Sequence, residues 1–179
     1  MASFTERMIG AATLNVKTYE EVEHDESALP QAMAVVALSV IASGIGSAGF
    51  GGSRGLVGGL ITAGVGWVVW AGIIFVVGTK LLPEPSTKAD FGQLLRTIGF
   101  AASPGILNIL GIIPFFGWLV RLVVWIWQLM TTVVAVRQAL DYKSTGKAVV
   151  VCLVGFVAYL FVAFWLAAFF GLGGMALGR

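Results

Sequence analysis

The chain has 179 residues, of which 58% are hydrophobic and only 11% are charged, and its mean hydropathy is +0.94. An ordinary soluble domain is excluded, because its water-facing surface would need far more charged residues. The 24 glycines favour helices that approach one another closely in lipid. The composition therefore predicts an all-α, polytopic integral membrane protein, and a net charge of +2 without a basic patch does not indicate a nucleic-acid partner.

Residues 1–31 are predicted to form a short amphipathic segment outside the bilayer. Six acidic residues and the lack of a long apolar run exclude a cleavable signal peptide. An apolar stripe suits a helix in the headgroup zone; it comprises Phe4, Met8, Ala11 and Ala12. A second helix is predicted to open at Thr18, because Glu21 completes a capping box. The acidic residues around His24 are interpreted as a solvated face rather than a metal site, since no second histidine or cysteine lies nearby.

Five apolar runs follow and predict a membrane domain over residues 32–179. The predicted spans are 32–50, 56–82, 98–113, 118–139 and 148–170. A glycine-rich turn at 51–55 reverses the chain after the first span. The apolar run 98–139 would measure roughly 63 Å as one helix, about twice the bilayer core, so it must turn back, and Pro114 to Gly117 supplies the turn. Pro104 is expected to kink the third span.

The stretch from Ser86 to Gly105 is the longest polar interruption between the spans. Thr87 followed by Asp90 predicts a helix start through a capping box. The first half of this stretch is expected to lie along the membrane surface as an amphipathic helix, and the half with Pro104 is expected to enter the bilayer. We therefore interpret the stretch as a joint between an N-terminal hairpin of spans and a three-span unit.

The distribution of charge predicts the orientation of the five spans. With the N-terminus inside, eight basic residues fall on the inner side and Arg54, Arg121 and Arg179 fall outside, as the positive-inside rule requires. All nine acidic residues also fall inside. We expect the cytoplasmic face to carry the function, with the C-terminus outside.

Two runs of residues carry a family resemblance. They are Asp90 to Gly105 (D-F-G-Q-L-L-R-T-I-G-F-A-A-S-P-G) and Val133 to Tyr142 (V-V-A-V-R-Q-A-L-D-Y). With five spans and a cytoplasmic N-terminal segment, the chain resembles the Yip-domain family of Ypt/Rab-interacting membrane proteins. What the resemblance implies for eukaryotic members is that they act together with Rab GTPases at ER and Golgi membranes. This chain lacks their long cytosolic N-terminal region and their aspartate-leucine-tyrosine-glycine segment. It is more similar to the compact prokaryotic members, and this similarity implies a location in a bacterial cytoplasmic membrane.

Four charged residues near the inner membrane surface form a candidate site. Asp90 and Arg96 precede the third span, while Arg137 and Asp141 lie four positions apart at the end of the fourth. We expect Asp90 to pair with Arg137 and Arg96 with Asp141, which would lock the inner ends of the spans together. A docking site or a proton relay is the alternative, and structural pairing is favoured because charges at membrane edges are usually neutralised.

Polar residues within the predicted spans are few. Asn108 falls in the third span and Gln128 near the middle of the fourth. Transporters place broken helices and polar side chains at this depth, but hydrogen bonds between helices explain these residues at least as well.

The sequence favours a non-catalytic function. No metalloprotease, nucleophile-elbow or P-loop motif is present, and no cofactor or metal is expected. The preferred hypothesis is a membrane scaffold or adaptor that engages protein partners at its cytoplasmic face and shapes the lipid bilayer through its N-terminal segment. The alternative is a small channel or transporter, oligomeric with copies of itself, that uses the kinked third span.

Overall fold

The computed structural model describes residues 2–47, 56–113 and 115–177 of the chain, and these residues form helices and no strands. The α-helices are α1 (Phe4–Ala12), α2 (Val16–His24), α3 (Leu29–Ser47), α4 (Leu56–Val76), α5 (Phe91–Ala101), α6 (Gly117–Ala139) and α7 (Thr145–Leu177). The shorter or tighter helices are η1 (Glu26–Ala28), the π-helical turn η3 (Val77–Leu81) and the 3₁₀ helix η4 (Ser103–Ile112). The predicted turn at 51–55, Pro114 and Arg179 lie outside the described residues.

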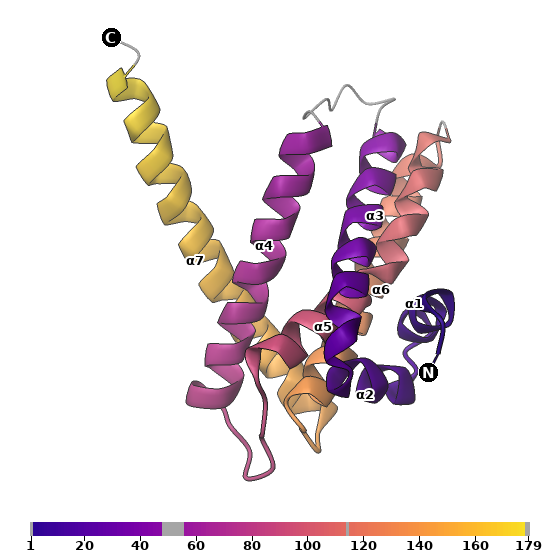
Figure 1. Cartoon of the computed structure of the whole chain (residues 1–179). Helices are drawn as coiled ribbons and strands as arrows, with labels where there is room; N and C mark the ends of the chain where they lie inside the picture. Colours follow the sequence, from indigo (N-terminus) through magenta and orange to yellow (C-terminus); the bar gives the residue numbers. More distant parts are fainter. Residues whose placement is uncertain (1, 48–55, 114, 178–179) are drawn as a thin grey trace.

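Five segments of the described chain are long and apolar enough to cross a membrane, which confirms the predicted all-α membrane fold. They are Glu26–Ser47, Gly58–Leu81, Phe91–Ile112, Gly117–Ala139 and Thr145–Trp165. The long helices α3, α4, α6 and α7 point toward one end of the molecule, and α1, α2 and α5 gather at the other (Figure 1). α7 packs against α4 through the contact of Tyr159 with Trp70 and diverges from α4 toward its C-terminal end (Figure 1).

The third segment differs from its prediction in two ways. Pro104 does not kink a continuous α-helix, because the α-helix ends at Ala101 and Pro104 lies in the first turn of the 3₁₀ helix η4, where its missing N–H is tolerated. α5 is also not a surface helix, since most of it from Leu94 onward is buried. The segment Phe91–Ile112 is in fact the most enclosed of the five, with 56% of its most apolar window buried against 17–28% in the others.

Small residues allow η4 to lie directly against α3. A Cβ atom added at Gly46 would overlap the carbonyl oxygen of Asn108, and one added at Gly105 would come within 2.9 Å of the Ser39 Cβ. Contacts this close can form only where side chains are absent or small, as is common where membrane helices pack. The glycines of this region therefore allow η4 to pack directly against α3.

The N-terminal helices form part of the core rather than a separate surface segment. Ala11, Tyr19 and Val22 are fully buried, and the Tyr19 hydroxyl donates a hydrogen bond to the Ala11 carbonyl (3.0 Å). α2 begins at Val16 with Asn15 as its N-cap, so the predicted start at Thr18 is wrong. The buried side chains of α1 and α2 therefore belong to the same hydrophobic core as the membrane helices.

Candidate functional site

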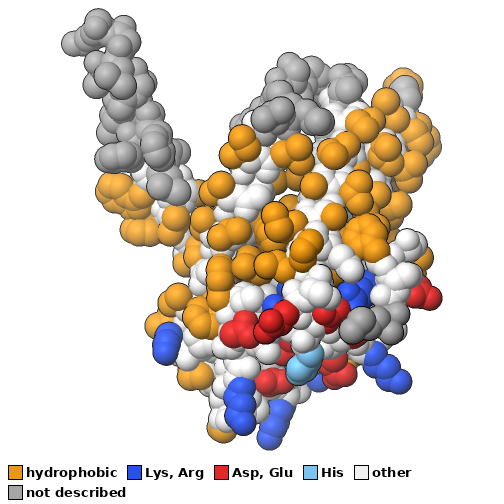
Figure 2. All heavy atoms as spheres, in the orientation of Figure 1, with side chains coloured by type: hydrophobic (Ala, Val, Ile, Leu, Met, Phe, Trp, Pro, Cys, Tyr) orange, Lys and Arg blue, Asp and Glu red, His pale blue; other side chains and the backbone are white. Residues whose placement is uncertain are grey.

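Charged side chains gather at the end of the molecule that holds α1, α2 and α5, below an apolar surface (Figure 2). We call this end the charged base; it comprises α1, α2, α5, the loop 82–90 and the turn 140–144 between α6 and α7. It contains three of the four charged residues of the predicted cluster, and the fourth, Arg137, lies beside it in the last turn of α6. The contacts of these residues show how the base is held together.

Arg7 joins α1 to α2 at the centre of the base. Its residue is only 2% exposed, and its Nη2 lies 2.8 Å from Glu21 Oε1 and 2.6 Å from Asp25 Oδ2. Its Nη1 donates to Gln31 Oε1 (3.1 Å), which extends the connection to α3. The hydrogen bond from Arg7 lowers the pKa of the Glu21 carboxyl, while Ser27 first and Arg7 second lower that of Asp25.

This network was not predicted from the sequence, where the acidic residues of α2 were interpreted as a solvated face. One signal could have revealed it. Arg7 follows Phe4 by three positions and precedes Ala11 by four, so it lies on the apolar stripe of α1. An arginine on a buried stripe needs acceptors, and the acidic residues of the next helix were the available ones.

Arg96 holds the C-terminal end of α2. Its Nε donates to the Val22 carbonyl (3.0 Å) and its Nη2 donates to the Glu23 carbonyl. These carbonyls have no partner within their own helix, so the guanidinium acts as a cap supplied by α5. Arg96 is 6% exposed. The predicted pairing of Arg96 with Asp141 is therefore wrong, because the guanidinium is directed at backbone oxygens instead.

Asp90 is the N-cap of α5. Its Oδ1 accepts from the Gln93 N–H (2.8 Å), and Gln93 Oε1 accepts from the Asp90 N–H (2.7 Å), which is a complete capping box. The helix start predicted at Thr87 is wrong, since the Thr87 hydroxyl instead accepts from the Glu84 N–H in a preceding turn. The predicted Asp90–Arg137 pair is also wrong. The ion pairs between described residues are Arg7–Glu21, Arg7–Asp25 and Lys147–Glu84.

Arg137 and Asp141 shape the turn between α6 and α7. Arg137 donates to the Tyr142 carbonyl (3.3 Å) and to the Thr145 hydroxyl (3.2 Å). Asp141 has a left-handed backbone (φ 52°), and the N–H groups of Asp141 and Tyr142 donate to the carbonyls of Gln138 and Arg137. This is a Schellman motif, in which the residue after the C-cap adopts that conformation. Arg137 and Asp141 therefore both stabilise the turn between α6 and α7.

Tyr142 then connects this turn to the end of the second membrane segment. Its hydroxyl lies 3.0 Å from the Gly78 carbonyl and 2.7 Å from the Leu82 carbonyl. Both carbonyls belong to the π-helical turn η3 and its C-cap, where regular helix hydrogen bonding ends. Burial raises the pKa of Tyr142 to about 12. The hydroxyl consequently stays protonated and can hold the end of η3.

Glu23 is a buried carboxyl group on α2. Its residue is 3% exposed, and burial first, then the negative charge of Asp141, raises its pKa to about 7. The exposed residues of α2 include Lys17, Glu20 and His24, and the His24 Nδ1 lies 2.8 Å from the Glu20 carbonyl. Within the described parts of the chain, no group of three or more His, Cys, Asp or Glu side chains is arranged to hold a metal ion.

The polar residues of the membrane segments bond to the backbone exposed at the break between α5 and η4. Ser39 Oγ and Gln128 Nε2 donate to the Ala102 carbonyl (2.7 and 3.4 Å), and Thr131 Oγ1 donates to the Ala101 carbonyl (2.7 Å). Such side chains are what allows a helix break inside a membrane. Asn108 Nδ2 donates to Ser43 Oγ on α3 (3.2 Å). Gln128 and Asn108 thus connect helices, and Ser39 and Thr131 are buried.

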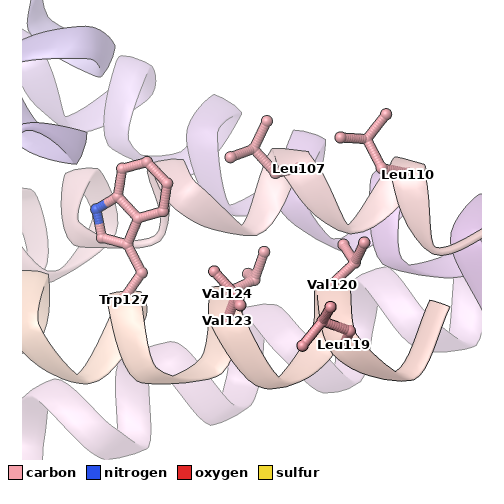
Figure 3. A pocket seen from close by; sticks show the side chains of 7 residues that line it. All are labelled: Leu107, Leu110, Leu119, Val120, Val123, Val124 and Trp127. Atoms are coloured by element: carbon pink, nitrogen blue, oxygen red, sulfur yellow. The ribbon is translucent and has the colours of Figure 1, made fainter. Parts of the chain in front are cut away.

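A shallow apolar hollow lies beside these bonds, between η4 and α6 (Figure 3). Its volume is about 260 Å³, and it is lined by Leu107, Leu110, Leu119, Val120, Val123, Val124 and Trp127. The indole N–H of Trp127, the one polar side-chain group in this lining, donates to the Ala12 carbonyl at the end of α1 (2.7 Å).

The sequence model of the Yip1 domain matches residues 13–173. No curated protein and no solved structure matches the chain.

Proposed function

The chain belongs to the Yip1 domain family of membrane proteins, and from that premise we propose that it is a non-catalytic membrane scaffold whose charged base presents α2 to protein partners. In this proposal the base faces the cytoplasm of a bacterial cell and the spans lie in the inner membrane. The supporting observation is that Arg7 and Arg96, both buried, fasten α2 to α1 and α5. A fastened helix offers a partner a preorganised surface, which lowers the entropic cost of binding.

The residues available to a partner are the exposed ones of α2 and η1. They include Lys17, Glu20, His24 and Glu26. Crosslinking in native membranes followed by mass spectrometry is expected to join partners to this surface and also reports any homo-oligomer. The double variant Glu20→Lys/Glu26→Lys reverses charge on exposed side chains only, so it is expected to lose those crosslinks while its thermal stability in detergent is unchanged.

The matched control is Glu20→Gln/Glu26→Gln, which removes charge without reversing it and is expected to weaken the crosslinks less. Unchanged partner crosslinks in the Lys variant would contradict the scaffold proposal. Deletion of the N-terminal segment is a poorer test, because it would remove Ala11, Tyr19 and Val22 from the core and leave their neighbours exposed.

We further propose that the N-terminal helices shape the bilayer next to α6. The Trp127–Ala12 hydrogen bond fixes the end of α1 beside Trp127, which lies 10 residues after the start of α6 at Gly117. At 1.5 Å per residue this is roughly 15 Å along the helix, or about half of the hydrocarbon thickness. α1 would then occupy space that lipid of one leaflet fills elsewhere. Electron cryo-microscopy of nanodiscs is expected to show a thinner bilayer beside α1 than beside α7, and equal thickness would contradict this part.

The alternative of a channel or transporter has less support. Gln128, Ser39 and Thr131 all donate to backbone carbonyls at the break in the third segment. The hollow beside them is lined by apolar residues apart from the bonded indole N–H. Solute flux in proteoliposomes that is abolished by Gln128→Leu would favour the transporter over the scaffold.

A further inference from the structure

We propose that the hollow between η4 and α6 binds one acyl chain of a membrane phospholipid, which enters from the leaflet opposite the charged base. This inference depends on the membrane location of the fold and not on the scaffold function.

The lining excludes polar occupants. All seven lining side chains are apolar except for one indole N–H, and that group is already bonded to the Ala12 carbonyl. A water molecule needs two or more polar partners, which this lining does not supply. A peptide segment would need partners for its backbone N–H and C=O groups. A hydrocarbon chain needs neither, so it is the occupant that the chemistry permits.

The hollow continues into the surface that faces lipid. Leu107, Leu119 and Val123 line it and are 39–50% exposed, while Val124 at its floor is 2% exposed. Figure 3 shows that the lining side chains come from both helices, with Leu107 and Leu110 on η4 and the other five, including Trp127, on α6. A chain lying here would contact two helices at once, whereas a chain on the outer surface of α7 would contact one. This difference should slow its exchange with bulk lipid.

The two ends of the hollow differ. At the end near the base, the Trp127–Ala12 bond brings the C-terminal end of α1 against α6, and the turn that follows α1 holds the polar residues Thr13 and Asn15. At the other end, Leu110 and Leu119 are 46% and 40% exposed, and Trp118 nearby is 64% exposed. Tryptophan is enriched where helices meet lipid headgroups. The headgroup is therefore expected at the Leu110 end and the methyl end of the chain at Trp127.

The test uses the full chain in vesicles of phosphatidylcholine that contain a trace of the same lipid with a photoactivatable diazirine on one acyl chain. Irradiation and peptide mass spectrometry locate the labelled residues. A diazirine near the ester end is expected to label Leu110 and Leu119, and one near the methyl end is expected to label Leu107 and Trp127. The reverse order would overturn the direction of entry.

A matched pair of variants distinguishes a binding site from ordinary lipid contact. Val123→Phe adds bulk inside the hollow and is expected to reduce labelling of Leu107 and Trp127 about fivefold. Val157→Phe adds the same bulk to α7, where Val157 is 67% exposed, and is expected to leave that labelling unchanged. Equal labelling in the two variants would overturn the site. If Val123→Phe does not fold, Leu110→Ala is informative, because a wider entrance should increase labelling and an unchanged level would count against the proposal.

Discussion

The third and fifth membrane segments have nearly the same length and opposite surroundings. Phe91–Ile112 has a mean hydropathy of 1.3 in its most apolar window, and 56% of that window is buried. Thr145–Trp165 has a mean hydropathy of 2.6, and only 17% of its window is buried. The less apolar segment therefore lies inside the protein and the more apolar one faces outward.

The difference follows from the bilayer as a solvent. Lipid is as apolar as a leucine side chain, so burial among other helices gives an apolar helix no hydrophobic gain. Small residues and hydrogen bonds must hold the buried segment instead. Arg96, Ser39 and Thr131 provide such bonds to or from the third segment, whereas α7 displays Phe161 and Phe164 at more than 60% exposure.

The largest predicted effect comes from removing the arginine of the buried segment. Arg96→Ala leaves the Val22 and Glu23 carbonyls without their donor, and the expected loss of unfolding free energy is about 4 kcal/mol, since each buried unsatisfied group costs about 1–3 kcal/mol. Hydrogen exchange at the end of α2 should accelerate. The control Arg137→Ala loses bonds within one turn and is expected to lose about 1 kcal/mol without accelerating exchange in α2. Equal losses in both variants would contradict the role of Arg96.

The next prediction tests the close packing of η4 against α3. Gly46→Ala places a Cβ atom against the Asn108 carbonyl and is expected to cost about 3 kcal/mol of unfolding free energy through steric strain. Gly64→Ala is the matched control on α4, where an added Cβ meets nothing within 4 Å. It is expected to be neutral or to stabilise by about 0.5 kcal/mol through helix propensity. Chemical unfolding in mixed micelles measures both, and similar values would contradict the close packing of η4.

The third effect is a pH dependence of the unfolding free energy that arises from Glu23 on α2. The pKa of Glu23 is about 7 in the folded chain against a usual 4.5, so the folded state holds this proton more firmly than the unfolded state. Its stabilising contribution is complete below pH 4.5 and is lost as the pH rises through about 7. Glu23→Gln should remove this slope and raise the unfolding free energy at pH 8 by roughly 2–3 kcal/mol.

The measurement for Glu23→Gln is the unfolding free energy at a series of pH values between 5 and 8. Titration of Glu23 makes the unfolding free energy of the unmodified chain depend on pH within this range. Glu20→Gln on the exposed side of the same helix is the control and should retain the slope of the unmodified chain. A slope that persists in Glu23→Gln would show that another group titrates in this range.

The smallest effect concerns the turn that begins α7. Asp141 has a φ of 52°, a conformation that costs most residues about 1–2 kcal/mol. Asp141→Val should therefore lower the unfolding free energy by about 1 kcal/mol, while Asp141→Gly should be neutral or stabilising. If Asp141 formed an ion pair with Arg96, the Gly variant would be the destabilised one. Thermal unfolding in detergent separates these outcomes.

Hydropathy was sufficient to predict five membrane segments, because length and apolar content alone identify them. It could not predict which segment is central. The start of α5 was not predicted either, since both Thr87 and Asp90 begin a possible capping box in the sequence. A local turn decides between them, because the Thr87 hydroxyl accepts a hydrogen bond from the Glu84 N–H and Asp90 caps the helix.

The charged cluster was predicted from proximity to the membrane, and its pairing was wrong for a physical reason. A buried arginine can be satisfied by carbonyl oxygens as well as by carboxylates, and helix ends supply unpaired carbonyls. Arg96 uses the end of α2, and Arg137 uses the turn after α6. The two family-like runs nevertheless hold residues that matter for assembly, because Asp90 and Arg96 lie in one run and Tyr142 closes the other.

The hydrogen bond between Trp127 and Ala12 joins residues that are 115 positions apart. A ribosome adds about 5–20 residues per second, so Trp127 is made on the order of 10 s after Ala12. During that interval the first helix has emerged without its partner on α6. The contact between α1 and α6 can therefore form only after much of the fourth membrane segment has been synthesised, well after α1 itself.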